Sequence, residues 1–543
     1  MKNVIAASLL IALIVPAAAQ DVQDPVLRAM GDELARSTAS LSMRNYKPPY
    51  FMAFSARDVK SVSASAIFGA LLDADERHYH VGFSQVRVGS PKFDNTNFLG
   101  STEHDGTASL SVDGDYYNPR FNFWALSDDA YKAALEKLAQ KRAYMQKKNI
   151  ADHEDDFSPV KPVVRISGEK REDVVLGDWP EVVKRVSAVF KKYPAVQKGL
   201  VNMELQSVVS RYRNSEGSLS MGPGFEALFT IGATAQAEDG FRLDKTRRFI
   251  YASKADLPSA EFLSAQAEEL GAEMTSLVHA SSPTAYLGPV IFEGDAAGRF
   301  FEHLLARNLT NMRQIWSERE YGNGGAGEFF NRLGMRVAAP FISVVDDPLA
   351  KTYEGVTLFG HYEVDSEGVP AQKVQVVRKG KLVDFLMSRT PAKERYYSNG
   401  HGRGEGDDIV GAPSNLFVQA EKTVSDSKLR SMFLDMCREQ EQDYCIIIRD
   451  IGNFYGPFTA FRVDARTGRE EPLRGLEFSG LGTRALRDIA AASRTARVFN
   501  YFTRNGGISI IAPSVLVQEV EIKRTEKKPE RMPYLGHPYF SER

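Results

Sequence analysis

Residues 365–389 read Asp-Ser-Glu-Gly-Val-Pro-Ala-Gln-Lys-Val-Gln-Val-Val-Arg-Lys-Gly-Lys-Leu-Val-Asp-Phe-Leu-Met-Ser-Arg, and this stretch decides the fold. It begins with a turn, because its Gly-Val-Pro core joins a residue that tolerates positive φ to one that presets φ. Val374 and Val376 then alternate with polar residues, which is the period of a half-buried strand. Lys379 and Gly380 separate two such runs, as a hairpin turn does. The stretch therefore predicts paired strands in a β-rich domain.

The composition is that of a large globular protein. The chain has 543 residues, of which 43% are hydrophobic and 25% charged. This length favours two or more domains with a sizeable core. The formal net charge is −2, so no broad electrostatic attraction to nucleic acid or to an anionic membrane is expected.

Residues 1–19 have the layout of a secretory signal peptide. Lys2 supplies a positive charge, an apolar run covers 4–15, and three alanines at 17–19 precede Gln20. The apolar run is short for a transmembrane span; an uncleaved N-terminal anchor is the alternative. We therefore expect an exported chain, periplasmic in a Gram-negative host or secreted, without a membrane segment after cleavage.

The rest of the chain predicts an α+β fold in two domains. Residues 20–285 combine paired strands with long helices, and acidic residues and prolines place a candidate subdomain break at 150–162. Residues 286–522 are rich in strands, and 523–543 form an extended tail. The order of elements is not a regular βαβ repeat, which argues against a doubly wound sheet.

The periodicity predicts the following elements. Helices are expected near 20–45, 127–148, 179–190, 258–279, 296–309, 426–439 and 481–493. Strands are expected near 51–54, 59–72, 78–88, 201–212, 224–235, 241–252, 290–293, 341–345, 355–362, 444–449, 458–464 and 508–522.

The chain contains two cysteines, Cys437 and Cys445. An oxidising compartment permits a disulfide between them, and two buried free thiols are the alternative. Two cysteines are too few for a cysteine-rich zinc site.

Common catalytic motifs are missing from the sequence: it has no G-x-S-x-G, P-loop or HExxH pattern. Residues 398–406 carry glycine at alternate positions, which predicts either a substrate-facing loop with His401 and Arg403 as its polar groups or a flexible connector. The Asp346-Asp347 pair after a strand suits a cation or, more simply, the cap of a turn.

The region 334–389 resembles the C-terminal part of the TldD/PmbA family of metallopeptidases and their partner subunits. The matching elements are Asp346-Asp347-Pro348, the segment 365–372, Gly380-Lys381-Leu382 and Arg389. The segment 512–522 is similar to the family's closing strand. The resemblance extends over the mature chain and is most specific between 286 and 522.

In active members of that family, a helix carries a His-Glu-x-x-x-His motif and a later cysteine completes a zinc site. Two imidazoles and a thiolate then hold the metal, and the glutamate acts as general base. The resemblance places this helix at 296–309, with Phe301 and Ala306 at the histidine positions and Glu302 at the glutamate position. Residues 500–507, where the cysteine is expected, contain none. Only Glu302 remains as a candidate catalytic residue.

The resemblance therefore implies a non-catalytic subunit. The family includes partner subunits that lack the metal motif and assemble with a catalytic paralogue around an enclosed cavity. We expect no cofactor in this chain, zinc in the partner, a homo- or heterodimer with a paralogue of this type, and a peptide as substrate.

Two other hypotheses stay open. One is an active metallopeptidase with relocated ligands, in which His303, His361 and His401 converge with Glu302 on a metal at roughly 2 Å. His303 follows Glu302 directly and points to a different helix face, because successive helical residues rotate by roughly 100°. The other is a stand-alone peptide-binding or structural protein.

Overall fold

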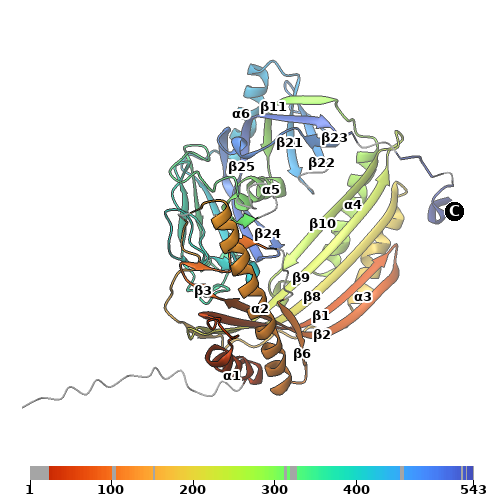
Figure 1. Cartoon of the computed structure of the whole chain (residues 1–543). Helices are drawn as coiled ribbons and strands as arrows, with labels where there is room; N and C mark the ends of the chain where they lie inside the picture. The colour runs from red at the N-terminus through yellow and green to blue at the C-terminus, as the bar shows by residue number, and fades with distance from the viewer. Residues whose placement is uncertain are drawn as a thin grey trace, which may run out of the picture.

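The structure is a computed structural model, in which two domains are built around two separate sheets (Figure 1). It describes residues 24–100, 106–150, 153–310, 313, 315–317, 327–452, 458–526, 530–533 and 535–541. The predicted signal peptide at 1–19 lies outside the described residues. Within them, no helix is long and apolar enough to cross a membrane.

The N-terminal domain contains one seven-stranded sheet in the order β10-β9-β8-β1-β2-β6, with β7 paired to β9. Its strands are β1 (Phe51–Ile67), β2 (Ala70–Arg87), β6 (Thr107–Leu110), β7 (Val164–Ile166), β8 (Val196–Asn214), β9 (Leu219–Gln236) and β10 (Arg242–Tyr251). Because β1 pairs with β8 along its length, the strands before and after 150–162 form one sheet. The candidate subdomain break at 150–162 is therefore not a boundary of this sheet.

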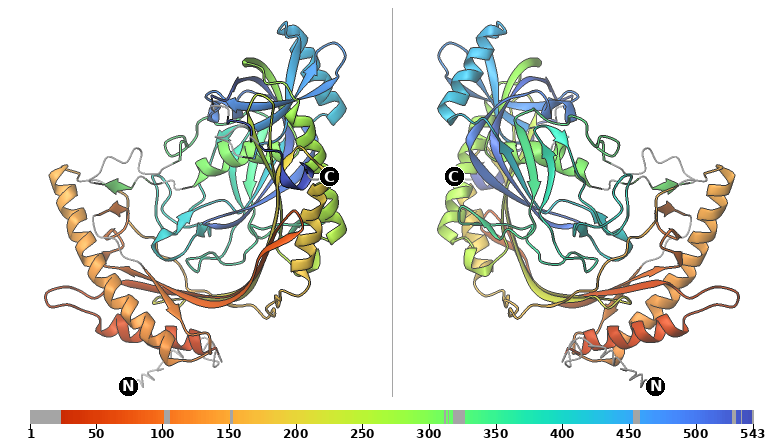
Figure 2. Two further views of the ribbon diagram at one scale, coloured as in Figure 1. Left: turned by 90° about the vertical axis from the view of Figure 1, so that its right-hand side faces the viewer. Right: turned by 90° about the vertical axis from the view of Figure 1, so that its left-hand side faces the viewer.

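Helices cover one face of this sheet. They are α1 (Pro25–Ser40), α2 (Tyr117–Lys147), α3 (Trp179–Ala188) and α4 (Ala260–Val278). Successive residues of a strand point to opposite faces: Phe54 packs against α1 and α2, and Val62 packs against α3 and α4. On the other face, Arg57 forms a 3.0 Å ion pair with Glu405 of the C-terminal domain. Figure 2 shows the long strands curving round that domain.

The C-terminal domain contains a ten-stranded sheet that closes on itself. β11 pairs with β21 on one side and with β25 on the other, and β23 also pairs with β25. The strands are β11 (Ala285–Phe292), β13 (Ile342–Asp346), β16 (Val374–Arg378), β17 (Lys381–Leu382), β20 (Asn415–Ala420), β21 (Tyr444–Asp450), β22 (Phe458–Asp464), β23 (Glu470–Phe478), β24 (Ile489–Thr503) and β25 (Gly506–Arg524). Two helices, α5 (Asp295–Leu304) and α6 (Asp426–Glu439), accompany the sheet. These features confirm the predicted α+β class.

Short elements complete the described part of the chain. Two-residue strands pair as β3 (Gly89–Ser90) with β4 (Phe93–Asp94), β5 (Phe98–Leu99) with β12 (Trp316–Ser317), β14 (Thr352–Tyr353) with β15 (Val356–Thr357) and β18 (Gly402–Arg403) with β19 (Val410–Gly411). The 3₁₀ turns are η1 (Val189–Lys192), η2 (Lys254–Asp256), η3 (Ala306–Leu309), η4 (Gly406–Asp408) and η5 (Thr483–Leu486).

Several predicted elements differ from the structure. The helix expected at 481–493 is wrong, because η5 is followed there by β24, which pairs with β25. The strand expected at 355–362 is only the two-residue β15. The helix expected to start at 127 begins at Tyr117. The tail, predicted to be extended, ends in the short helix α7 (Pro538–Ser541).

The hairpin predicted at Lys379 and Gly380 is confirmed. Their φ angles are 48° and 77°, and β16 pairs with β17 directly across them. A Cβ added to Gly380 would lie 2.4 Å from the carbonyl oxygen of Ala338. Both the left-handed backbone and this close approach require glycine here.

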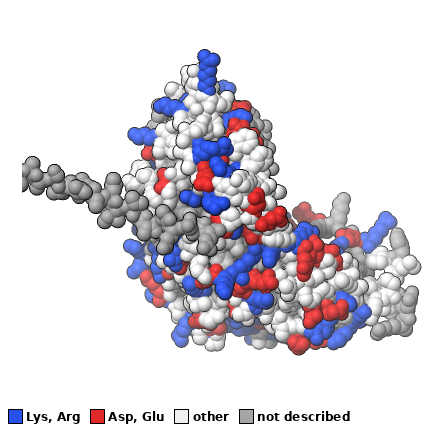
Figure 3. Space-filling model, turned by 90° about the horizontal axis from the view of Figure 1, so that it is seen from below, with Lys and Arg blue, Asp and Glu red and all other residues white. Residues whose placement is uncertain are grey.

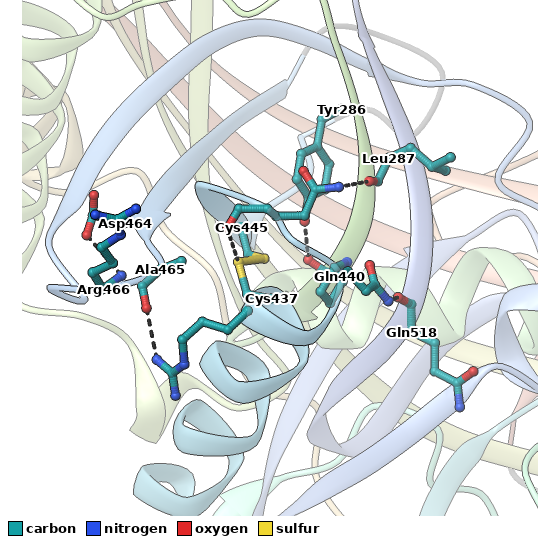
Figure 4. Close-up of a disulfide and its surroundings, with 12 residues drawn as sticks. Tyr286, Leu287, Cys437, Gln440, Cys445, Asp464, Ala465, Arg466 and Gln518 are labelled. Carbon is teal, nitrogen blue, oxygen red and sulfur yellow. Dashed lines mark hydrogen bonds between the residues drawn. A yellow bond between two sulfur atoms is a disulfide. The ribbon is translucent and has the colours of Figure 1, made fainter.

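Cys437 and Cys445 form a disulfide. The bond joins the C-terminal end of α6 to the start of β21, and both residues are fully buried (Figure 4). Of the two possibilities left by the sequence, the structure shows the disulfide.

Surface charge is mixed on the face seen in Figure 3, where lysine and arginine side chains are interspersed with aspartate and glutamate. No extended patch of one sign dominates that face, which agrees with the small net charge of −2.

Candidate functional site

Helix α5 lies where the two domains approach each other. Gly294, with φ 61°, turns the chain after β11, and the helix starts at Asp295. Its apolar residues, including Phe300 and Phe301, are buried in the core of the C-terminal domain. Gly298 lets the helix pack closely, because a Cβ there would lie 2.4 Å from the Phe499 side chain. The polar side of the helix is thereby left towards the N-terminal domain.

A cavity of about 1000 Å³ lies beside that polar side of α5. Asp295 and Arg299 line it from α5, and residues 241–250 line it from nearly the whole of β10 and the residue before it. Burial, followed by the charge of Asp450, raises the pKa of Asp295. Aromatic side chains of the C-terminal domain complete the wall: Phe458, Phe461, Phe499 and Tyr501.

Charges on the cavity wall are largely paired. Arg247 contacts Glu269 at 2.7 Å and Glu273 at 3.2 Å. Lys245 also contacts Glu273, and its Nζ lies 3.5 Å from Asp450. The wall is therefore polar and aromatic with little net charge.

Strand β10 presents a free edge to this cavity. Among the described strands, β10 pairs only with β9 and ends the sheet. Consecutive residues from both faces of β10 line the cavity, as expected where a strand edge borders it. An unpaired strand edge offers backbone N–H and C=O groups to an extended chain.

The zinc site implied by the family resemblance does not fit the residues present. Phe301 is fully buried and Ala306 is 1% exposed, both within the apolar core. Neither side chain can bind a metal. Glu302 is held by Arg307 at 2.7 Å and by Arg299 at 3.5 Å, so its carboxylate already has cationic partners.

The cysteine position also lacks a ligand. Residues 500–507 fall on β24, β25 and the turn between them and contain no cysteine. The two cysteines of the chain are joined to each other. We therefore derive no chemical step through zinc at α5.

The histidines proposed as relocated ligands do not converge. No three of Glu302, His303, His361 and His401 bring ligand atoms within 4.8 Å of one another. His361 Nδ1 lies 3.0 Å from the Pro348 carbonyl oxygen. Burial, followed by the charge of Arg307, lowers the pKa of His303. The metallopeptidase with relocated ligands is therefore not supported by the geometry.

The side chains predicted to face substrate from the 398–406 loop are buried. His401 is fully buried, with Nε2 3.1 Å from Asp346 Oδ1. Arg403 is 8% exposed and donates to the carbonyl oxygens of Pro413 and Gly507. The loop instead contributes 404–406 to a second cavity of about 200 Å³ between the domains.

Asp346 acts as a structural acceptor rather than as part of a cation site. Besides the contact with His401, it accepts hydrogen bonds from the backbone N–H and the hydroxyl of Ser414. Asp347 accepts from the backbone N–H of Leu349 at 3.2 Å. The turn-capping interpretation of this acidic pair is therefore the one that the geometry supports.

The 365–389 segment positions the domains. Asp365 Oδ1 accepts the backbone N–H groups of Glu367 and Val369, each at 2.9 Å, which fixes the turn. Arg389 is fully buried, and its guanidinium binds Glu216 of the N-terminal domain at 2.6 and 3.0 Å. It also donates to the Ser158 carbonyl oxygen. These residues hold the two domains together.

Two carboxyl groups are buried within this segment. Asp365 is 5% and Glu367 3% exposed. Burial, followed by the charge of Glu367, raises the pKa of Asp365 to about 8. Burial also raises the pKa of Glu367. The pair retains a proton at neutral pH because two adjacent buried charges repel each other.

The sequence did not predict the 1000 Å³ cavity. Its lining includes residues of β10, α4, α5, β21, β22 and β24, which are far apart in the chain. The one local signal was the density of basic residues at 242–248, which alone is typical of many solvated strands.

Comparison with protein families agrees with this architecture. Residues 285–524 match the family model described as the PmbA/TldA metallopeptidase C-terminal domain. A metalloprotease from Archaeoglobus fulgidus is 24% identical over 365 residues, which cover 65% of this chain and 78% of that protein. A metalloprotease from Methanothermobacter thermautotrophicus is 28% identical over 254 residues, covering 45% of this chain and 51% of that protein.

A metalloprotease TldD homolog from Buchnera aphidicola is 24% identical over 162 residues, which cover 29% of this chain and 31% of the homolog. Against these last two relatives the chain therefore spans about half or less of their length.

Solved structures share the fold over nearly the whole chain. TldE from Thermococcus kodakarensis superposes with a TM-score of 0.57 at 14% identity, covering 91% of this chain and 100% of that one. A putative modulator of a DNA gyrase from Thermotoga maritima gives 0.57 at 16% identity, covering 91% and 99%. At these identities the likeness is one of fold.

These matches and the closed C-terminal sheet define a metallopeptidase-like protein. Residues 285–524 belong to the TldD/PmbA family, and the relatives and the shared fold agree with that family.

Proposed function

We propose that this chain is a non-catalytic subunit that pairs with a zinc-bearing paralogue in peptide proteolysis. The observation that carries the proposal is the position of α5. The helix borders the 1000 Å³ cavity through Asp295 and Arg299, yet its residues do not fit the zinc ligands of the family. The chain has a cavity beside α5 and lacks the residues that would bind zinc there.

The chamber suits an extended polypeptide. The free edge of β10 offers backbone hydrogen bonds that do not depend on the peptide's sequence. Phe458, Phe461 and Phe499 offer apolar contacts, and the paired charges leave little net field. The substrate class is accordingly an unfolded peptide of mixed sequence.

Export belongs to the same proposal. The layout of residues 1–19 supports it, and the buried Cys437–Cys445 disulfide supports an oxidising compartment. The zinc-bearing partner would need its own export signal.

Peptide cleavage tests the proposal. We expect the mature chain alone to bind an unfolded polypeptide such as casein and not to cleave it. Cleavage should appear when a TldD/PmbA chain with an intact His-Glu-x-x-x-His motif is added, and the two chains should then co-elute from a size-exclusion column.

Two results would overturn it. Cleavage by the chain alone that disappears in Glu302→Gln would show an enzyme. A peptide-binding chain that never co-elutes with a motif-bearing paralogue would show a stand-alone protein.

A further inference from the structure

Two histidines and an aspartate meet on the helix-bearing face of the N-terminal sheet, away from the cavities. His78 and His80 are two residues apart on β2, so both side chains point to the same face. Asp58 of β1 lies directly opposite His80 in the strand register. Asp58 shares its face with Phe54, which packs on α1 and α2, and with Val62, which packs on α3 and α4. The three residues lie between the two helix pairs.

The ligand atoms of these residues lie close together. Asp58 Oδ1 is 2.9 Å from His78 Nε2, and Asp58 Oδ2 is 2.9 Å from His80 Nε2. One ligand atom from each residue can be chosen so that all lie within 4.8 Å of one another. His78 is 36% exposed, so its ring can rotate to adjust the third distance.

His80 supplies the second observation. Its side chain is 7% exposed, and the buried Nε2 makes no hydrogen bond despite its carboxylate neighbour. The in-plane direction of that nitrogen therefore passes beside Oδ2 rather than towards it. A nitrogen and an oxygen that share one zinc ion at roughly 2 Å lie about 3 Å apart, with the nitrogen pointing at the ion between them.

Arg171 fixes the carboxylate from the other side. Its guanidinium is 2.8 Å from Asp58 Oδ1 and is anchored on the hydroxyl and carbonyl oxygens of Ser207. Hydrogen-bonded outer partners of this kind orient metal-binding carboxylates. Lys60, which lies opposite His78 in the strand register, forms a 3.7 Å ion pair with Asp173.

We propose that Asp58, His78 and His80 bind a divalent metal ion of the zinc class. Two imidazoles and one carboxylate form a nitrogen-rich set that favours zinc and its transition-metal neighbours over calcium or magnesium. Three protein ligands leave at least one coordination position open to water or to another ligand. This site is separate from the α5 position and does not depend on the proposed function.

Metal titration tests the site. The untagged mature chain, stripped with a chelator and dialysed, is titrated with ZnCl₂ by calorimetry and with CoCl₂ by visible absorbance. We expect one equivalent of zinc to bind. Cobalt should give d–d absorbance bands that disappear when added zinc displaces the cobalt. His78→Gln and His80→Gln should each weaken zinc binding by at least the roughly 10–100-fold that loss of an outer-shell partner costs, whereas the matched control His361→Gln should bind as the wild type does.

A thermal melt tests whether the variants are folded. His78 is partly exposed, so His78→Gln should melt like the metal-free wild type, and zinc should stabilise only the wild type and the control. Absence of zinc binding in the wild type, or equal binding in the wild type and both histidine variants, would overturn the proposal.

This result can be told apart from failure of the proposed function. Zinc bound here is lost in His80→Gln and kept in Glu302→Gln. A peptidase metal at α5 would show the reverse pattern and would be accompanied by cleavage.

Discussion

Asp365 and Glu367 belong to the stretch that resembles the family, and both have a structural role. Their carboxyl groups are buried, and their oxygen atoms accept backbone N–H groups of Val369, Gly402 and Arg389. A Cβ on Gly402 would lie 2.5 Å from Glu367 Oε2 and 3.0 Å from Asp365 Oδ2, so both acids crowd the same point. The residues that identify the family are thus used to build the domain contact.

The buried acids predict a pH-dependent stability. The pKa of Asp365 is about 8 in the fold and about 4 in an unfolded chain. The folded state therefore holds a proton that the unfolded state has released, and stability falls as pH rises from about 4 to about 8. The slope is up to about 1.4 kcal/mol per pH unit. Denaturant unfolding at pH 6 and pH 8 should show this loss.

Glu367→Gln should flatten that dependence, because it removes the charge that repels ionised Asp365 and keeps an acceptor for the Arg389 N–H. Glu405→Gln is the matched control, since Glu405 is 36% exposed and lies outside the pair. A wild-type protein equally stable at both pH values would contradict the prediction.

At the scale of elements, the sequence predicted those turns and helix ends that neighbouring residues determine. The turn at Lys379 and Gly380 places both residues at positive φ, and Gly380 is the residue that signals this turn in the sequence. Helix α6 has the predicted bounds of 426–439, because Ser425 caps it and its apolar face repeats at helical spacing. The helix predicted at 481–493 is wrong because pairing with β25 overrides the helix propensity of its alanines.

The disulfide at the end of α6 predicts a measurable stability. Closing a loop of this length, with a sequence separation of 8, contributes about 2–3 kcal/mol in the chain-entropy description. Cys437→Ala/Cys445→Ala should lower the unfolding free energy by that amount, measured by denaturant titration.

Wild type reduced with dithiothreitol is the matched comparison for this pair. It should fall towards the double variant, whereas the double variant should not respond to the reductant. Equal stability of oxidised wild type and double variant would show that the bond contributes nothing.

The candidate metal site could not be predicted from sequence alone. The spacing of His78 and His80 can be recognised in the sequence, but Asp58 lies twenty positions before His78. It reaches them only because the turn at Phe68 and Gly69 sets the register of β1 and β2. Register is a property of the folded sheet, so the third ligand appears only with the structure.

For the whole molecule, Arg389 is the largest fully buried side chain in the contact between the domains. It is fully buried, binds Glu216 with two hydrogen bonds and lies 3.8 Å from the Phe157 ring centroid. Arg389→Met should lower the unfolding free energy by roughly 3 kcal/mol, because it removes one partner of a largely buried pair and orphans the Ser158 carbonyl. Thermal and denaturant melts measure this loss.

Glu216→Gln is the milder comparison, since Glu216 is 34% exposed and an amide oxygen can still accept. We expect it to cost about 1 kcal/mol. If Arg389→Met were no worse than Glu216→Gln, the guanidinium would not be the principal tie between the domains.

The pairing of β11 with β25 sets the timing of folding. β25 is the last strand of the C-terminal sheet and also pairs with β20, β23 and β24. β25 must therefore be synthesised before β11, β20 and β23 can pair with it, and such long-range pairing is intrinsically slow. The C-terminal sheet can therefore close only after synthesis of its final strand, whereas the strands of the N-terminal sheet are all complete by residue 251.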